Sequence, residues 1–294
     1  MEQQVALVVG GTKGIGKEVV RQLARKGYHV LFVGRSEEAG KALEAELNQR
    51  GSATFIQGDM SLLAETHRVA LRIREMTPTL NILIHSADIL AMDRIETAEG
   101  HEMAFAINYL SRFLMNDLLM DHLKAGQARI LHIAAAGSPF TLNASSFPPG
   151  PKVNSMTGHG IGQGANDVYG IEMAERLRDT GVTINILNPG GVDTDIRRNM
   201  KLHGLQKMIM PVMMMVMKVV FRMKLTQPEE YARVPVDYAT NPRHKGLTGQ
   251  WIKWDGTLFE IKPERYPQSM RDHVWRETER LVAEYRALPE PAFA

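Results

Sequence analysis

Short apolar runs and longer segments with helical spacing alternate along most of the chain. Apolar runs of four to six residues predict buried strands over residues 5–9, 28–33, 53–56, 81–84, 129–133 and 182–187. Apolar positions three and four residues apart predict helices over residues 17–26, 37–50, 102–123 and 159–178. This alternation predicts an α/β fold with a parallel sheet wound on both faces and ligands at the carboxyl ends of the strands. No linker divides residues 1–294, so one domain is expected.

The first predicted strand runs directly into a glycine-rich turn. Gly10, Gly14 and Gly16 lie between that strand and the first helix, in the segment VALVVGGTKGIG. Glycine lets the backbone turn sharply and come close to a diphosphate. The free N–H groups at the N-terminus of a helix attract the negative charge of that diphosphate. The position between a strand and a helix favours a dinucleotide site. A structural turn without a ligand is the alternative.

Two basic residues bear on the choice of dinucleotide. Arg35 closes the second predicted strand, and Lys13 lies inside the glycine turn. An acidic residue at the end of this strand binds the ribose hydroxyls of NAD(H), whereas a base accommodates a 2′-phosphate. The two cations therefore favour NADP(H) over NAD(H). Alternatively, both are solvated surface bases.

Composition narrows the class of protein without identifying it. Hydrophobic content of 44% and charged content of 23% are typical of a soluble globular protein, and the net charge of +2 implies no nucleic-acid partner. The absence of cysteine excludes thiolate chemistry and Cys-ligated metals, and no metal site is predicted. The first strand begins too close to Met1 for a signal peptide, which favours a cytoplasmic location.

A methionine-rich stretch over residues 208–221 stands out from this ordinary composition. Pro211 and Lys218 interrupt it, and it is too short for a membrane-spanning helix, so no stable membrane insertion is expected. One interpretation is a helix that packs in the core. Another is an adaptable wall or lid over an apolar ligand, within a substrate region of about 195–226, because thioether side chains fit irregular shapes. Contact with a membrane surface is the third.

Several segments together resemble the short-chain dehydrogenases/reductases, most of all their retinol-dehydrogenase-like branch. They are the glycine turn, INYLSRF around Asn108, the NPGGVDTDI turn, and the C-terminal stretches QPEEYA, GLTGQ and WRETERLV. The resemblance implies a Rossmann-like doubly wound sheet with bound NADP(H), and homo-oligomers of open stoichiometry formed through the two long helices. The residues that it implies at the cofactor are Gly10, Thr12, Lys13, Gly14, Ile15, Gly16, Arg35, Asp59, Met60, Ala87, Pro189, Gly190 and Thr194.

The same resemblance implies a degenerate catalytic tetrad. The family uses a Ser, a Tyr, a Lys and an Asn, in which the Tyr exchanges a proton with the substrate and the Lys lowers its pKa. Here Ala135 stands at the Ser position, His159 at the Tyr position and Gln163 at the Lys position, and only Asn108 remains. The family's Asn-Asn-Ala-Gly after the fourth strand is replaced by a sequence ending in Asp88, which places a carboxylate near the cofactor.

Three functions are compatible with this pattern. The sequence favours a non-redox enzyme that cyclises, isomerises or dehydrates a bulky apolar small molecule, with candidate catalytic residues His159, Asn108 and Asp88 and a cofactor bound only structurally. An NADPH-dependent reductase of carbonyl or enone compounds, in which His159 supplies the proton, is the alternative. A non-catalytic NADP(H)-binding protein is the third.

Overall fold

A parallel sheet forms the centre of the structure, which is a computed structural model that describes residues 3–49, 52–135, 137, 142–193 and 226–289. The strands lie in the order β3-β2-β1-β4-β5-β6-β7-β8, and all neighbours are parallel except β7 and β8. The bounds of the strands are β1 Val5–Val9, β2 His29–Gly34, β3 Ser52–Gln57, β4 Ile82–His85, β5 Arg129–Ile133, β6 Thr183–Leu187, β7 Gln250–Ile252 and β8 Leu258–Phe259. Burial on both faces explains why the central strands read as continuous apolar runs.

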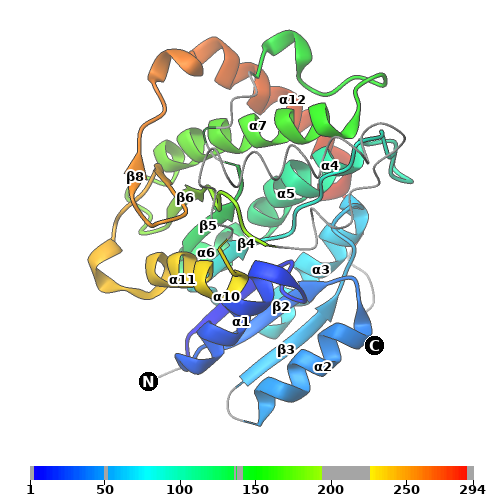
Figure 1. Ribbon diagram of the computed structural model, residues 1–294. Helices are drawn as coiled ribbons and strands as arrows, with labels where there is room; N and C mark the ends of the chain where they lie inside the picture. Colours follow the sequence, from blue (N-terminus) through cyan, green and yellow to red (C-terminus); the bar gives the residue numbers. More distant parts are fainter. Residues whose placement is uncertain (1–2, 50–51, 136, 138–141, 194–225, 290–294) are drawn as a thin grey trace, which may run out of the picture.

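Helices cover both faces of the sheet (Figure 1). The bounds of the helices are α1 Gly14–Arg25, α2 Glu37–Asn48, α3 Leu63–Met76, α4 Met103–Phe105, α5 Ser111–Leu118, α6 Met120–Ala125, α7 Ser155–Arg176, α10 Pro228–Tyr231, α11 Arg233–Thr240 and α12 Gln268–Arg286. One buried apolar cluster joins α3, α5, α7 and α12 to the sheet, and a second joins α1, α2, α10 and α11 to its other face. The predicted doubly wound α/β fold is therefore confirmed.

Two helices differ from their prediction in ways that matter for the site. The segment predicted as one helix over 102–123 contains a π-helical turn, Ala106–Leu110, and α5 gives way to α6 at Leu119. Helix α7 begins at Ser155, because the Asn154 side chain accepts a hydrogen bond from the N–H of Thr157 at 2.8 Å. His159 consequently lies in the second turn of α7 instead of at its start.

The two shortest strands, β7 and β8, and the helices α3, α10, α11 and α12 were not predicted. Strands of three and two residues carry no periodicity that a sequence pattern can reveal. The predicted substrate region of about 195–226 and the methionine-rich stretch 208–221 lie outside the described residues, apart from residue 226.

Candidate active site

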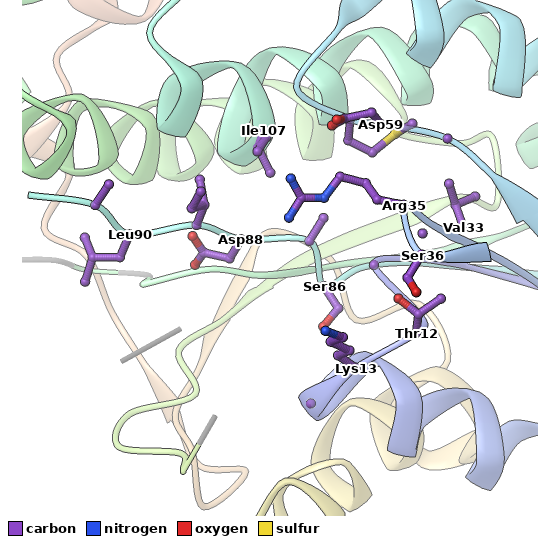
Figure 2. A pocket seen from close by; sticks show the side chains of 18 of the residues that line it. Thr12, Lys13, Val33, Arg35, Ser36, Asp59, Ser86, Asp88, Leu90 and Ile107 are labelled. Carbon is purple, nitrogen blue, oxygen red and sulfur yellow. The ribbon is translucent and has the colours of Figure 1, made fainter. Parts of the chain in front are cut away.

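A cleft of about 840 Å³ opens at the carboxyl ends of β1, β2, β3 and β4. Four segments line most of it, namely 10–15 without residue 11, 33–36, 58–60 and 86–93, and Figure 2 shows their side chains around the cavity. Between β1 and β4 the order of the strands reverses, and such a switch point is where open α/β sheets bind their ligands. The site of the cleft therefore follows from the topology of the sheet.

The glycine turn lets the backbone come close to its neighbours at the floor of the cleft. Gly10 has φ 86°, and a Cβ built on it would lie 2.4 Å from the backbone nitrogen of Ala87. A Cβ on Gly16 would lie 2.1 Å from the carbonyl oxygen of Gly10. The side chain of the N-cap residue Lys13 does not cap α1, and the first turn of this helix carries no acidic residue. The N–H groups of this turn are thus placed for an anion.

Most of the residues predicted at the cofactor line this cleft. Nine of the thirteen do so: Gly10, Thr12, Lys13, Gly14, Ile15, Arg35, Asp59, Met60 and Ala87. Asp88, which was predicted as a catalytic residue, lines the cleft as well. Figure 2 shows the Arg35 side chain extending across the cleft, between Val33 on one side and Asp88 on the other.

Three predicted cofactor residues lie away from the cleft lining. Gly16 packs against the turn itself, which makes its role one of close approach between helix and turn. Pro189 and Gly190 follow β6, and Gly190 faces the ring of Trp254, 3.2 Å from a Cβ built on the glycine. Thr194 lies outside the described residues.

His159 lies next to Asp88, just outside the lining of the cleft. Its Nδ1 atom is 2.8 Å from the side-chain nitrogen of Asn108 and 3.2 Å from the carbonyl oxygen of Ile89. The Asp88 Oδ1 atom is 3.4 Å from the same Nδ1. Burial lowers the pKa of His159, whereas the Asp88 carboxylate raises it, and the net result is a pKa above the ordinary value. The three predicted catalytic residues are therefore brought together.

The orientation of Asn108 favours one tautomer of the neutral ring in the site without substrate. Its side-chain oxygen accepts from the N–H of Ile89 at 3.1 Å, and its nitrogen donates to the carbonyl of the same residue at 3.1 Å. The amide nitrogen must therefore also be a donor toward His159 Nδ1, which places the ring proton on Nε2. When the ring is charged, Nδ1–H has the Ile89 carbonyl and the Asp88 carboxylate as acceptors.

Positions 135 and 163 are bonded to each other. The N–H of Ala135 donates to Gln163 Oε1 at 2.8 Å, so the amide nitrogen is the Gln163 atom that lies 3.4 Å from His159 Nε2. Both of these nitrogens are donors in the neutral site, and two donors do not bond to each other. Among the described residues, His159 Nε2–H is thus left without an acceptor and is available to a substrate oxygen.

The π-helical turn is held by a residue that the sequence did not reveal. Asn166 of α7 donates to the backbone carbonyls of Asn108 at 2.7 Å and Gly162 at 3.0 Å, and its oxygen accepts from His132 at 3.0 Å. A π-turn leaves carbonyls without their usual helical partners, and it often marks a functional position. Asn166 supplies the partner for Asn108.

Two buried histidines continue this array as neutral rings. Asn116 donates to His132 Nε2 at 3.1 Å and to the Tyr169 hydroxyl at 3.0 Å, and it accepts from His85 Nε2 at 2.8 Å. Burial lowers the pKa of His85 to about 3 and that of His132 well below its ordinary value. These bonds give every amide in the array a single consistent orientation.

One buried carboxylate fastens the loop after β5 to the C-terminal part of the chain. Asp167, four residues after Gln163 on α7, accepts from the N–H of Gly137 at 3.1 Å, Trp251 Nε1 at 2.9 Å and the Tyr266 hydroxyl at 3.0 Å. Burial raises the pKa of Asp167 to about 6, because desolvation outweighs these three donors. Asp167 and Gln163 together hold the loop beside His159.

Two other kinds of site are absent from the described part of the chain. No group of three or more His, Asp or Glu side chains there is placed to hold a metal ion. None of the described helices combines the length and apolar character that a membrane crossing requires.

Several known proteins are similar to this chain in sequence. A family model described as short chain dehydrogenase matches residues 4–145. Retinol dehydrogenase 14 of Homo sapiens is 26% identical over 96% of this chain and 87% of its own length, and polyprenol dehydrogenase of Danio rerio is 28% identical over 95% and 86%.

Two solved structures show the same fold. The Pseudomonas aeruginosa RhlG/NADP active-site complex has a TM-score of 0.65 and 21% identity, over 86% of this chain and 95% of that chain. An actinorhodin polyketide ketoreductase variant with NADPH has a TM-score of 0.66 and 22% identity, over 85% and 95%. In sequence, the chain is thus similar to the short chain dehydrogenase model over residues 4–145 and to the two curated dehydrogenases over most of its length, and in fold it is similar to both solved structures.

Proposed function

We propose that the protein is an NADP(H)-dependent oxidoreductase that interconverts an apolar alcohol and its carbonyl compound, with His159 as the acid and base. The observation that carries this proposal is the position of His159, whose Nδ1 lies beside Asn108 and Asp88 and whose Nε2–H has no acceptor among the described residues. Relatives named retinol dehydrogenase and polyprenol dehydrogenase support an apolar alcohol as substrate.

The cleft fits a dinucleotide. A Cβ on Gly10 would fill the space beside the Ala87 backbone, and the uncapped start of α1 faces the same region. Lys13 and Arg35 line the cleft and supply positive charge for a 2′-phosphate. The neighbouring folds in the RhlG/NADP and NADPH-bound ketoreductase structures support this assignment. When bound, the dinucleotide would supply or accept a hydride.

The residues of this chain would handle the proton. In the direction of reduction, the charged His159 ring would donate its Nε2 proton to the substrate oxygen as the carbonyl carbon gains a hydride, and the ring would be left neutral with its remaining proton on Nδ1, facing the Ile89 carbonyl and Asp88. In oxidation, the bare Nε2 of that neutral ring would take the proton back. General acid–base assistance of this kind contributes about 10²–10⁴-fold to a rate. Ala135 and Gln163 stand where the family pattern has Ser and Lys, so we propose that one residue, His159, performs the proton transfer in place of the usual Tyr.

The test measures NADPH oxidation with a panel of apolar aldehydes and ketones. We expect His159→Gln to lower kcat/KM at least a hundredfold while NADPH binding by calorimetry changes less than threefold. His29→Gln is the matched control, because His29 begins β2 at the end of the strand away from the cleft, and this variant should keep kcat/KM within twofold of the wild type. Full activity in His159→Gln would reject the role of His159.

The non-redox hypothesis receives less support, because the two curated relatives are named dehydrogenases and one of the similar structures is named a ketoreductase. It still makes a distinct prediction. Protein stripped of dinucleotide should turn over an apolar substrate if the chemistry is a cyclisation, isomerisation or dehydration, and should be inert if the chemistry is hydride transfer. A non-catalytic protein would bind NADPH and convert no member of the panel.

A further inference from the structure

A guanidinium lies fully buried beneath the loop that carries Asp88. Arg112 of α5 is only 1% exposed, and its Nη2 donates to the carbonyl of Ala87 at 2.8 Å. Its Nε and Nη1 atoms are buried and have no hydrogen-bond partner among the described residues. Burial lowers the pKa of Arg112 to about 10, partly offset by Asp88, so the side chain stays charged at neutral pH. A buried charge of this kind requires a nearby charge of opposite sign.

Asp88 is the carboxylate that meets this requirement. It follows Ala87 directly, so the bond from Arg112 to the Ala87 carbonyl fixes the backbone next to it. Among the described residues, the Asp88 Oδ1 atom receives no hydrogen bond that meets standard geometry, and its nearest charged partner is the His159 ring at 3.4 Å. Asp88 therefore stands between one permanent cation and one titratable ring.

Asp88 and Arg112 are the charged groups that act on the His159 ring, because the other polar groups packed around it are neutral or bonded elsewhere. From α7 itself, Gln163 faces the ring and is neutral. Glu102, the N-cap residue of α4, lies beside Gly158, the residue before His159, but its carboxylate accepts hydrogen bonds from the N–H groups of Ala104 and Phe105. The histidines of the buried array, His85 and His132, are neutral because burial lowers their pKa values.

We propose that Arg112 is a positioning residue. From beneath the site it supplies a positive charge that Gln163, which stands at the Lys position of the family pattern, does not carry. Arg112 holds the Ala87–Asp88 segment in place and opposes the attraction of Asp88 for a proton on His159. The pKa of His159 accordingly reflects two charges of opposite effect, with Asp88 raising it and Arg112 lowering it. This inference rests on the proposed role of His159 as the proton donor, since a weaker hold on the proton makes the ring a stronger acid.

The test is an NMR titration of His159, assigned by the loss of its signal in His159→Gln. We expect Arg112→Met and Arg112→Gln, which remove the charge, to move the pKa of His159 upward. Arg112→Lys, which keeps the charge, should leave it nearer to the wild-type value. Asp88→Asn should move it downward, so the two partners shift the same ring in opposite directions. The pH profile of kcat/KM should move in the same sense for each variant.

Two outcomes would overturn the inference. One is a neutral variant at Arg112 that folds, judged by far-UV circular dichroism, and titrates at His159 as the wild type does. The other is that both neutral variants fail to fold while Arg112→Lys folds, because the charge would then serve the fold instead of the ring. The titration does not require turnover. A failure of the proposed function, seen as full activity in His159→Gln, is therefore distinguishable from a failure of this inference.

Discussion

The two walls of the site use their residues in different ways. On the glycine-turn side, the cleft is shaped by backbone, with Gly10 against Ala87, and its charges, Lys13 and Arg35, are exposed. On the α7 side, polar side chains such as Asn166 are fully buried and each is bonded in one orientation. The first wall is suited to binding a large polar molecule by shape and charge. The second is suited to holding one ring in place for proton transfer.

This difference predicts that the glycine-turn wall loses its affinity for the dinucleotide when an added side chain fills the space at the backbone. Gly10→Ala places a Cβ 2.4 Å from the Ala87 nitrogen at φ 86°, and we expect the Kd for NADPH to rise at least a hundredfold. Gly100→Ala is the matched control, because Gly100 has φ 79° and no atom of the described residues lies within 4 Å of its Cβ position. The control should bear only the conformational cost of about 1–2 kcal/mol in stability. Equal binding by both variants would contradict a close approach at Gly10.

The α7 wall should lose stability when its buried hydrogen bonds are removed. Asp167→Asn presents an amide nitrogen to three donors, from Gly137, Trp251 and Tyr266. We expect the free energy of unfolding at pH 7, measured by urea titration, to fall by about 2–3 kcal/mol. Asp255→Asn is the control, because the Asp255 carboxylate likewise accepts hydrogen bonds, two from Thr257, but lies on an exposed turn. A loss at Asp255 as large as that at Asp167 would show that burial is not what makes Asp167 important.

The same contrast explains how much could be predicted from the sequence. The glycine turn, its cleft and the two exposed cations were predictable because each depends on neighbours within a few residues along the chain. Asn166, Arg112 and Asp167 were not, because a polar residue within a helix carries no mark of whether it is solvated or bonded to a distant segment. The early start of α7 did leave a signal in Asn154, a favoured N-cap residue.

The buried array also predicts a pH dependence of stability. The folded pKa of His85 is about 3, below the ordinary value of 6.5, so its contribution is complete above pH 6.5 and is lost as the pH falls toward 3. His85→Gln keeps a donor for Asn116 but no titration. Between pH 4 and 5.5, we expect the slope of unfolding free energy against pH to be smaller in this variant by about 1.4 kcal/mol per pH unit.

The control for this slope is His159→Gln. The pKa of His159 is raised in the folded state, so between pH 4 and 5.5 the ring is protonated whether the chain is folded or unfolded. Its removal should therefore leave the slope in that window unchanged. A slope that does not change in His85→Gln would mean that His85 becomes charged inside the folded protein, which would contradict a neutral array.

The smallest effect is expected from the exposed cations of the first wall. Arg35→Gln and Lys13→Gln should each weaken NADPH binding by about 1 kcal/mol, or roughly five- to tenfold, because exposed charge pairs are screened by solvent. NADH, which lacks the 2′-phosphate, should bind these variants and the wild type within twofold of each other. Lys26→Gln removes an exposed charge at the opposite end of α1 and should change neither affinity. If NADH binding falls as much as NADPH binding, the two cations contact the shared diphosphate instead of the 2′-phosphate, and the selectivity for NADP(H) must arise elsewhere on the glycine-turn wall.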